Sequence, residues 1–72
     1  MDTNEQKKLQ EGLMIGLKQM GIQTDSAIAI LLMLKSENQM LTMLDWIHKH
    51  HKENPSENLV IQIAKTIVEE ID

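Results

Sequence analysis

Three histidines lie close together and are the residues whose type and spacing could most directly do chemistry. On a helix, Asp45, His48 and His51 would be spaced at i, i+3 and i+6, so one carboxylate and two imidazoles would share a side. A weak metal site can form in that geometry. A zinc site generally takes a further ligand from elsewhere in the chain, and the sequence offers no evident one.

The same run of residues, His48-Lys49-His50-His51-Lys52, is also typical of a solvated helix C-terminus. The negative end of the helix dipole favours basic side chains there. We favour this interpretation and predict no metal and no cofactor.

The rest of the sequence contains no recognisable catalytic arrangement. It has no cysteine nucleophile, no Ser-His-Asp arrangement with local support and no Gly-rich phosphate loop after a strand. A chain of 72 residues would also have little core from which to build a catalytic cleft. We therefore predict no catalytic residues and a protein that is not an enzyme.

Length and composition predict one small helical domain covering residues 1–72. The chain is near the lower size limit at which a core supports a fold, and without cysteine it has no disulfide or thiolate metal site to help. Apolar residues make up 42% of the sequence, but Trp46 is the only Phe, Tyr or Trp. The core must therefore be built from aliphatic side chains and methionine, which is an adaptable filler.

The charge of the chain argues against nucleic acid as a partner. The net charge is −4, and all seven basic residues are lysine. Arginine supplies most bidentate contacts to guanine and to phosphate, so an acidic chain without arginine is a poor nucleic-acid binder. The start of the sequence, M-D-T-N-E-Q-K-K, has no apolar signal-peptide stretch, which predicts a cytoplasmic protein.

The longest apolar run is the segment 27–34, which reads A-I-A-I-L-L-M-L. It is too short to span a bilayer, which takes about 20 residues. Because the run has no polar side, we expect it to be the central element of the fold, covered on every face. The polar residues 35–39 follow at once and indicate a sharp change of direction.

Apolar periodicity places helices at about 4–20, 25–34, 37–50 and 55–71. The first, third and last of these each have one apolar stripe, and the stripe of the first holds Leu9, Leu13, Leu17 and Met20. Gly21 is suited to end the first helix in a left-handed conformation. Thr24 is a good N-cap for the second helix. For the last helix, Asn54 is the expected N-cap and Pro55 fits the first helical position.

The boundary between the second and third helices depends on one local motif. Ser36-Glu37-Asn38-Gln39 matches the capping box, in which the Ser and Gln side chains satisfy each other's backbone N–H groups. We therefore predict a break at Lys35-Ser36. The alternative is one uninterrupted helix from Asp25 to His50.

Several helices carry more apolar residues than one buried stripe needs, which predicts self-association, most simply as a homodimer. The spacing of Gly12 and Gly16 resembles the G-x-x-x-G pattern that lets two helices approach closely. These glycines make room for a helix of the same chain or for a second subunit, or they serve a ligand or a hinge. Lone tryptophans often anchor cores or interfaces. The candidate interface residues are Gly12, Met14, Ile15, Gly16, Trp46, Ile61 and Val68.

The segment 24–47, T-D-S-A-I-A-I-L-L-M-L-K-S-E-N-Q-M-L-T-M-L-D-W-I, followed by N-P-S-E-N, resembles small, uncharacterised all-helical proteins of bacteria and prophages. They carry a Thr-led apolar helix, a Leu-Lys-Ser/Thr-Glu-x-Gln turn and a Met/Leu helix. The resemblance covers about the middle half of the chain. It implies a compact helical fold and no activity, so it assigns no functional residue.

Taken together, the sequence predicts an all-α, compact bundle of three to four short helices that self-associates. The function that fits an acidic chain without catalytic motifs is a small adaptor or regulator that acts through protein–protein contacts. The alternative is a transcriptional regulator of the helix-turn-helix type, because the segments 25–34 and 37–50 would be tightly joined. No membrane association is expected.

Overall fold

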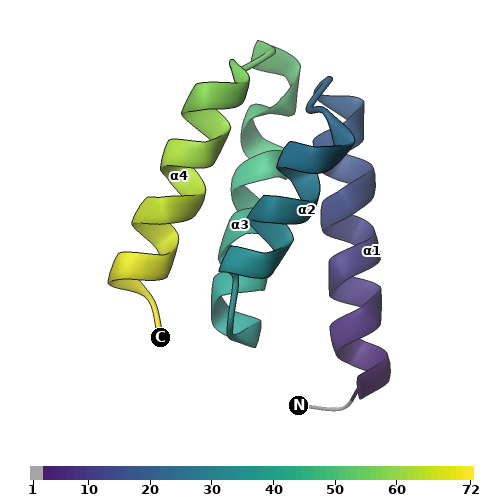
Figure 1. The fold of residues 1–72 in the computed structure, drawn as a ribbon, viewed down its shortest axis with the longest axis vertical. Coiled ribbons are helices and arrows are strands. Elements are labelled where there is room, and N and C mark those ends of the chain that lie inside the picture. Colours follow the sequence, from purple (N-terminus) through teal and green to yellow (C-terminus); the bar gives the residue numbers. More distant parts are fainter. Residues whose placement is uncertain (1–2) are drawn as a thin grey trace.

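The computed structural model describes residues 3–72, which form four α-helices and one short 3-10 helix (Figure 1). The elements are α1 (Thr3–Gln19), α2 (Thr24–Met33), α3 (Glu37–His50), η1 (His51–Glu53) and α4 (Glu57–Glu70). The helices run alternately up and down, so α1 is parallel to α3 and α2 is parallel to α4. Both α1 and α4 pack against α2 and α3, and this arrangement confirms the all-α compact bundle.

The core forms where the apolar stripes of the four helices meet. The stripes predicted for the first, third and last helices supply most of its buried side chains, which confirms the periodicity of 3.6 residues. The largest fully buried side chains are Leu13, Leu17, Ile30, Met40, Met43 and Val60. The core is therefore aliphatic and methionine-rich.

The turn between α1 and α2 ends α1 in the way that the sequence predicted. Gly21 has a φ of 83°, in the left-handed region that glycine adopts at little cost. Its N–H donates to the Lys18 carbonyl, and the Ile22 N–H donates to the Leu17 carbonyl, which is the Schellman pattern. Ile22 and Leu17 are both buried, so the turn also contributes to the core.

The expected N-cap of α2 is wrong by one residue. Thr24 lies inside the helix, and the N-cap position belongs to Gln23, whose side chain makes no capping bond. The Thr24 hydroxyl instead accepts a hydrogen bond from Lys18 Nζ at 2.6 Å, which joins α2 to the end of α1. At the other side of α2, Ser26 donates to the Glu57 carboxylate at the start of α4.

The helical conformation is interrupted between α2 and α3, as predicted, but only half of the capping box forms. Ser36 is the N-cap of α3, and its Oγ accepts from the Gln39 backbone N–H at 3.1 Å. The Gln39 side chain does not return to Ser36. Its Oε1 accepts from the Lys35 N–H at 2.6 Å, and its Nε2 donates to the Ile71 carbonyl at 2.6 Å.

These bonds make Gln39 a second polar tie between the two halves of the chain, beside the Ser26–Glu57 bond. It is the only buried polar residue of the described chain, with 6% of its surface exposed. Its amide joins the α2–α3 turn to the end of α4, 32 residues away in sequence. Both ends of the amide are satisfied, as a buried polar group requires.

The expectation that the apolar run is covered on every face is wrong. Ala27, Ile30 and Leu34 are buried, but Ile28 is 44% exposed and Leu32 is 69% exposed. The reason is architectural, because α2 packs between α1 and α4 and nothing lies over its outer side (Figure 1). The run is therefore a corner of the bundle and not its centre.

The start of α4 also differs from the prediction. Asn54 is not its cap but lies in the left-handed region, with a φ of 50°, where it ends η1. Ser56 is the N-cap of α4, and its Oγ accepts from the Leu59 N–H at 3.2 Å. Pro55 therefore precedes the helix, which begins at Glu57.

Candidate functional site: a groove between α1 and α3

An open groove of about 400 Å³ lies between the parallel helices α1 and α3. Its floor and walls are mostly apolar, and its polar groups gather towards the C-terminal ends of the two helices. The lining residues are Gly12, Ile15, Gly16 and Gln19 from α1, and Leu44, Ile47, His48 and His51 from α3 and η1.

The groove exists because two glycines remove side chains from one side of α1. A Cβ built on Gly16 would lie 2.9 Å from Ile47 Cγ2, closer than real Cβ atoms come, so α3 packs tightly against the backbone here. A Cβ on Gly12 would lie 3.9 Å from Leu44 Cδ1, which is ordinary contact. Gly16 therefore serves the helix contact within the chain, whereas the position of Gly12 has room for a Cβ.

Ile15 stands at the edge of the groove and is 58% exposed. An isolated exposed isoleucine is ordinary. Here, however, it adjoins the apolar side chains of Leu44 and Ile47 across the groove. Three of the predicted interface residues, Gly12, Ile15 and Gly16, are thus brought to one site.

The other four predicted interface residues do not join the groove. Met14, Trp46, Ile61 and Val68 are partly buried and pack against the core. The Trp46 ring also lies 4.9 Å from the His50 ring, with the two planes tilted by 35°. Their apolar surface is therefore largely accounted for within the chain.

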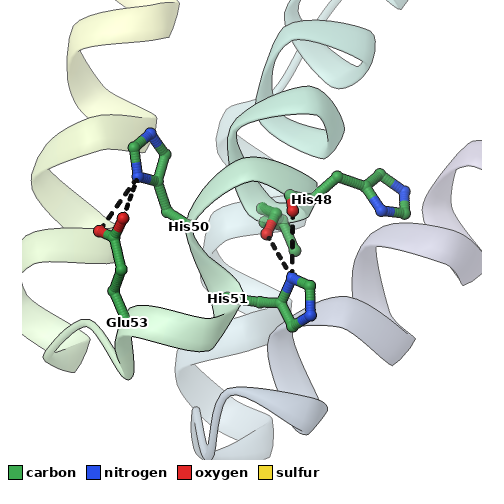
Figure 2. A network of polar contacts seen from close by, with 5 residues as sticks. His48, His50, His51 and Glu53 are labelled. Atoms are coloured by element: carbon green, nitrogen blue, oxygen red, sulfur yellow. Dashed lines mark hydrogen bonds and ion pairs between the residues drawn. The ribbon is translucent and has the colours of Figure 1, made fainter.

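The histidines lie near one another in sequence, but their side chains diverge. In Figure 2 the rings of His48 and His50 point in opposite directions. His50 Nδ1 lies 3.1 Å from Glu53 Oε1, whereas Asp45 pairs with Lys49 at 3.0 Å. Within residues 3–72, no group of three His, Cys, Asp or Glu side chains is arranged to hold a metal ion.

His51 shows what the cluster does locally. Its Nδ1 lies 3.3 Å from the Ile47 carbonyl oxygen and 3.2 Å from the His48 carbonyl oxygen (Figure 2). A carbonyl only accepts, so Nδ1 carries the proton and donates to both. The ring therefore donates to carbonyls at the C-terminal end of α3, of which the Ile47 carbonyl also accepts from the His51 backbone N–H.

Sequence reasoning missed a second exposed apolar surface, the outer side of α2. Ile28 and Leu32 lie one turn apart on it. We call these two residues the α2 ridge. No position within the apolar run is polar, so the sequence carried no signal that marked this side.

Comparisons with protein-family models, with curated proteins and with solved structures found no match to this chain. The resemblance of residues 24–47 to small bacterial and prophage proteins stays a prediction. Across the part of the chain that the structure describes, no helix combines the length and apolar character needed to cross a membrane.

Proposed function

We propose that this protein is a non-enzymatic interaction module and that the α1–α3 groove is its contact site. The observation that carries the proposal is the groove itself, with glycines in its floor and the exposed Ile15 at its edge. Burial of this concave apolar surface against a partner would remove it from water, which is favourable.

The shape of the groove favours a helical segment of a protein as its occupant. A groove between two parallel helices can receive the apolar face of a third helix, which is a recurring mode of peptide recognition. Its polar lining residues, Gln19, His48 and His51, all lie towards one end. A small-molecule site would instead enclose most of its ligand.

The alternative function, a helix-turn-helix regulator, gains no support from the geometry. The turn between α2 and α3 is tight, as that motif requires. However, residues 37–47 of α3 contain two acidic residues and no basic one. Near its start, the Thr42 hydroxyl is bonded to the Asn38 carbonyl at 2.7 Å. An acidic segment without basic side chains is unsuitable for a helix that must approach phosphates.

A selection with helical peptides tests the proposal. Peptides from a randomised amphipathic library would be selected on the immobilised protein and then tested on two variants. Gly12→Gln fills the groove with a long side chain, and Gly12→Ala is its matched control because a Cβ fits there. We expect peptides that bind the wild type and Gly12→Ala but lose at least about tenfold in affinity, 1.4 kcal/mol, on Gly12→Gln.

Backbone amide NMR shifts would show where such peptides bind. Shifts concentrated on the groove residues of α1 and α3 support the proposal. If every selected peptide binds Gly12→Gln as well as it binds Gly12→Ala, the groove is not the contact site.

A further inference from the structure

We infer that α4 is a releasable helix, which opens from the bundle as one unit while α1, α2 and α3 stay packed together. Opening uncovers the apolar sides of α2 and α3 that α4 masks. The inference does not depend on the groove. Four features carry it: the segment that leads to α4, the side chains that α4 buries, its low intrinsic helix propensity, and the polar ties at its two ends.

The segment that leads from α3 to α4 contributes nothing to the core. No residue between Ile47 and Val60 is buried. The turn between α1 and α2, in contrast, buries Ile22, and the turn between α2 and α3 follows the buried Leu34. The segment before α4 can therefore change its conformation without opening the core. It is the natural hinge of the bundle, and α4 has no further chain connection beyond its C-terminal end (Figure 1).

The side chains that α4 buries are smaller than those of α1, the other helix at an end of the chain. The buried residues of α1 are Leu13, Leu17 and Met20, whereas those of α4 are Val60, Ala64 and Ile67. The free energy gained by burial scales with apolar area, so α4 gains less. Both helices pack against α2 and α3, but α1 has the more extensive contacts. When α4 leaves, α1 therefore still holds α2 and α3 together.

The composition of α4 makes it dependent on packing to stay helical. β-branched side chains lose χ1 freedom in a helix and lower its stability. The β-branched residues of α4 are Val60, Ile61, Ile63, Thr66, Ile67 and Val68. A helix of 14 residues is also marginal in water by itself. Once released, α4 loses its helical hydrogen bonds along its whole length, which makes its opening a single event.

Hydrogen bonds near the two ends of α4 hold it closed. At its start, Ser26 on α2 donates to the Glu57 carboxylate. At its end, the Ile71 carbonyl accepts from Gln39 Nε2 at 2.6 Å. Water can bond to all four groups once α4 has left, so each tie contributes only its net hydrogen-bond free energy. Removal of one tie therefore shifts the opening of α4 and leaves the contact between α1 and α3 unchanged.

Native-state hydrogen exchange, followed by NMR on the full chain, tests the inference. A local opening lets the amides of the opened segment exchange while the rest of the structure stays protected. We expect the backbone amides of Ala64 and Ile67 to have protection factors at least about tenfold lower than those of Leu17 and Met43. Their exchange should also depend less steeply on urea, because release of one helix exposes less surface than global unfolding.

Two variants in the first turn of α2 make a matched pair. Ser26→Ala removes a tie to α4, whereas Thr24→Ala removes the bond from Lys18, which joins α2 to α1. We expect Ser26→Ala to speed exchange in α4 by about three- to tenfold, with little change in α1. Thr24→Ala should leave the exchange of α4 as it is in the wild type.

Three results would overturn the inference. Equal protection factors and one common urea dependence in α1 and α4 would show that the bundle opens only as a whole. Lower protection in α1 than in α4 would make α1 the helix that is released. If Ser26→Ala changed the exchange of α4 no more than Thr24→Ala does, the tie between α2 and α4 would not control the opening.

Discussion

The two ends of α3 both carry polar side chains, but only at one end does such a side chain bond to a distant segment of the chain. At the N-terminal end, Gln39 is buried and bonds to Ile71, 32 residues away. At the C-terminal end, His50 and His51 contact only residues three or four positions away, in exposed or half-exposed surroundings. The histidines, whose side chains could bind a metal, therefore make only local contacts. The Gln39 amide, in contrast, joins two segments that are distant in sequence.

The largest effect expected from this comparison is that of Gln39→Ala. It leaves the Lys35 N–H and the Ile71 carbonyl, which lie in partly buried surroundings, without their partner, and each lost hydrogen bond costs about 0.5–1.5 kcal/mol. We expect the free energy of unfolding to fall by about 1–3 kcal/mol, measured by urea denaturation with circular dichroism. Gln62→Ala, an exposed position on α4, is the control and should change it by less than about 0.5 kcal/mol. If Gln39→Ala lowered the free energy of unfolding no more than Gln62→Ala, the Gln39 amide would not hold the N-terminal end of α3 in place.

The next effect concerns the cap at the same end. Ser36→Ala removes the hydrogen bond from the Gln39 N–H and should cost about 1 kcal/mol in the same assay. Ser56→Ala is a matched substitution, since Ser56 caps α4 with almost the same geometry at a more exposed place. We expect Ser36→Ala to cost at least as much as Ser56→Ala. The reverse order would show that the turn before α3 is not the more firmly fixed of the two.

A smaller effect is expected at the C-terminal end of α3. His51→Ala removes a ring that donates to two backbone carbonyls, but water can reach this end of the helix and replace it. The expected loss is about 0.5 kcal/mol, and His50→Ala should cost no more, because its pair with Glu53 is exposed. Thermal unfolding of the two variants beside the wild type measures this. A loss above about 2 kcal/mol in either variant would place that histidine among the structural residues.

The smallest effect is that of added zinc. Because the imidazoles diverge and Asp45 pairs with Lys49, a zinc ion would gain little from the folded arrangement. A ligand raises the unfolding midpoint only when it binds the folded state preferentially. We expect thermal melts in zinc and in a chelator to coincide. A rise in the midpoint that His48→Ala abolishes would instead reveal a site.

Much of the fold could be predicted because its signals are local. The apolar repeat placed Leu13 and Leu17 in the core, Gly21 marked a left-handed turn, and Ser36 marked the start of α3. Each signal depends on residues within about one or two turns of a helix. Such information is complete in the sequence itself.

What could not be predicted depends on contacts between distant segments. The continuous apolar run 27–34 has no polar position that shows which side of the helix faces solvent. Ile28 and Leu32 could therefore not be recognised as exposed before the neighbours of α2 were known. The Gln39 amide has an obvious local partner in the capping box, and its bond to Ile71 has no local signature. In the groove, the glycine spacing predicted close packing, but only the position of Ile47 separates the role of Gly16 from that of Gly12.

Trp46 gives the molecule an optical property that follows from its neighbourhood. The chain has no Tyr and no Phe, so all of its aromatic side-chain fluorescence comes from the Trp46 indole beside His50. Emission therefore reports on the C-terminal half of α3 without background from any other region. Far-ultraviolet circular dichroism reports on all the helices together, and a difference between the two curves during unfolding would show local fraying of the histidine-rich end without any added label.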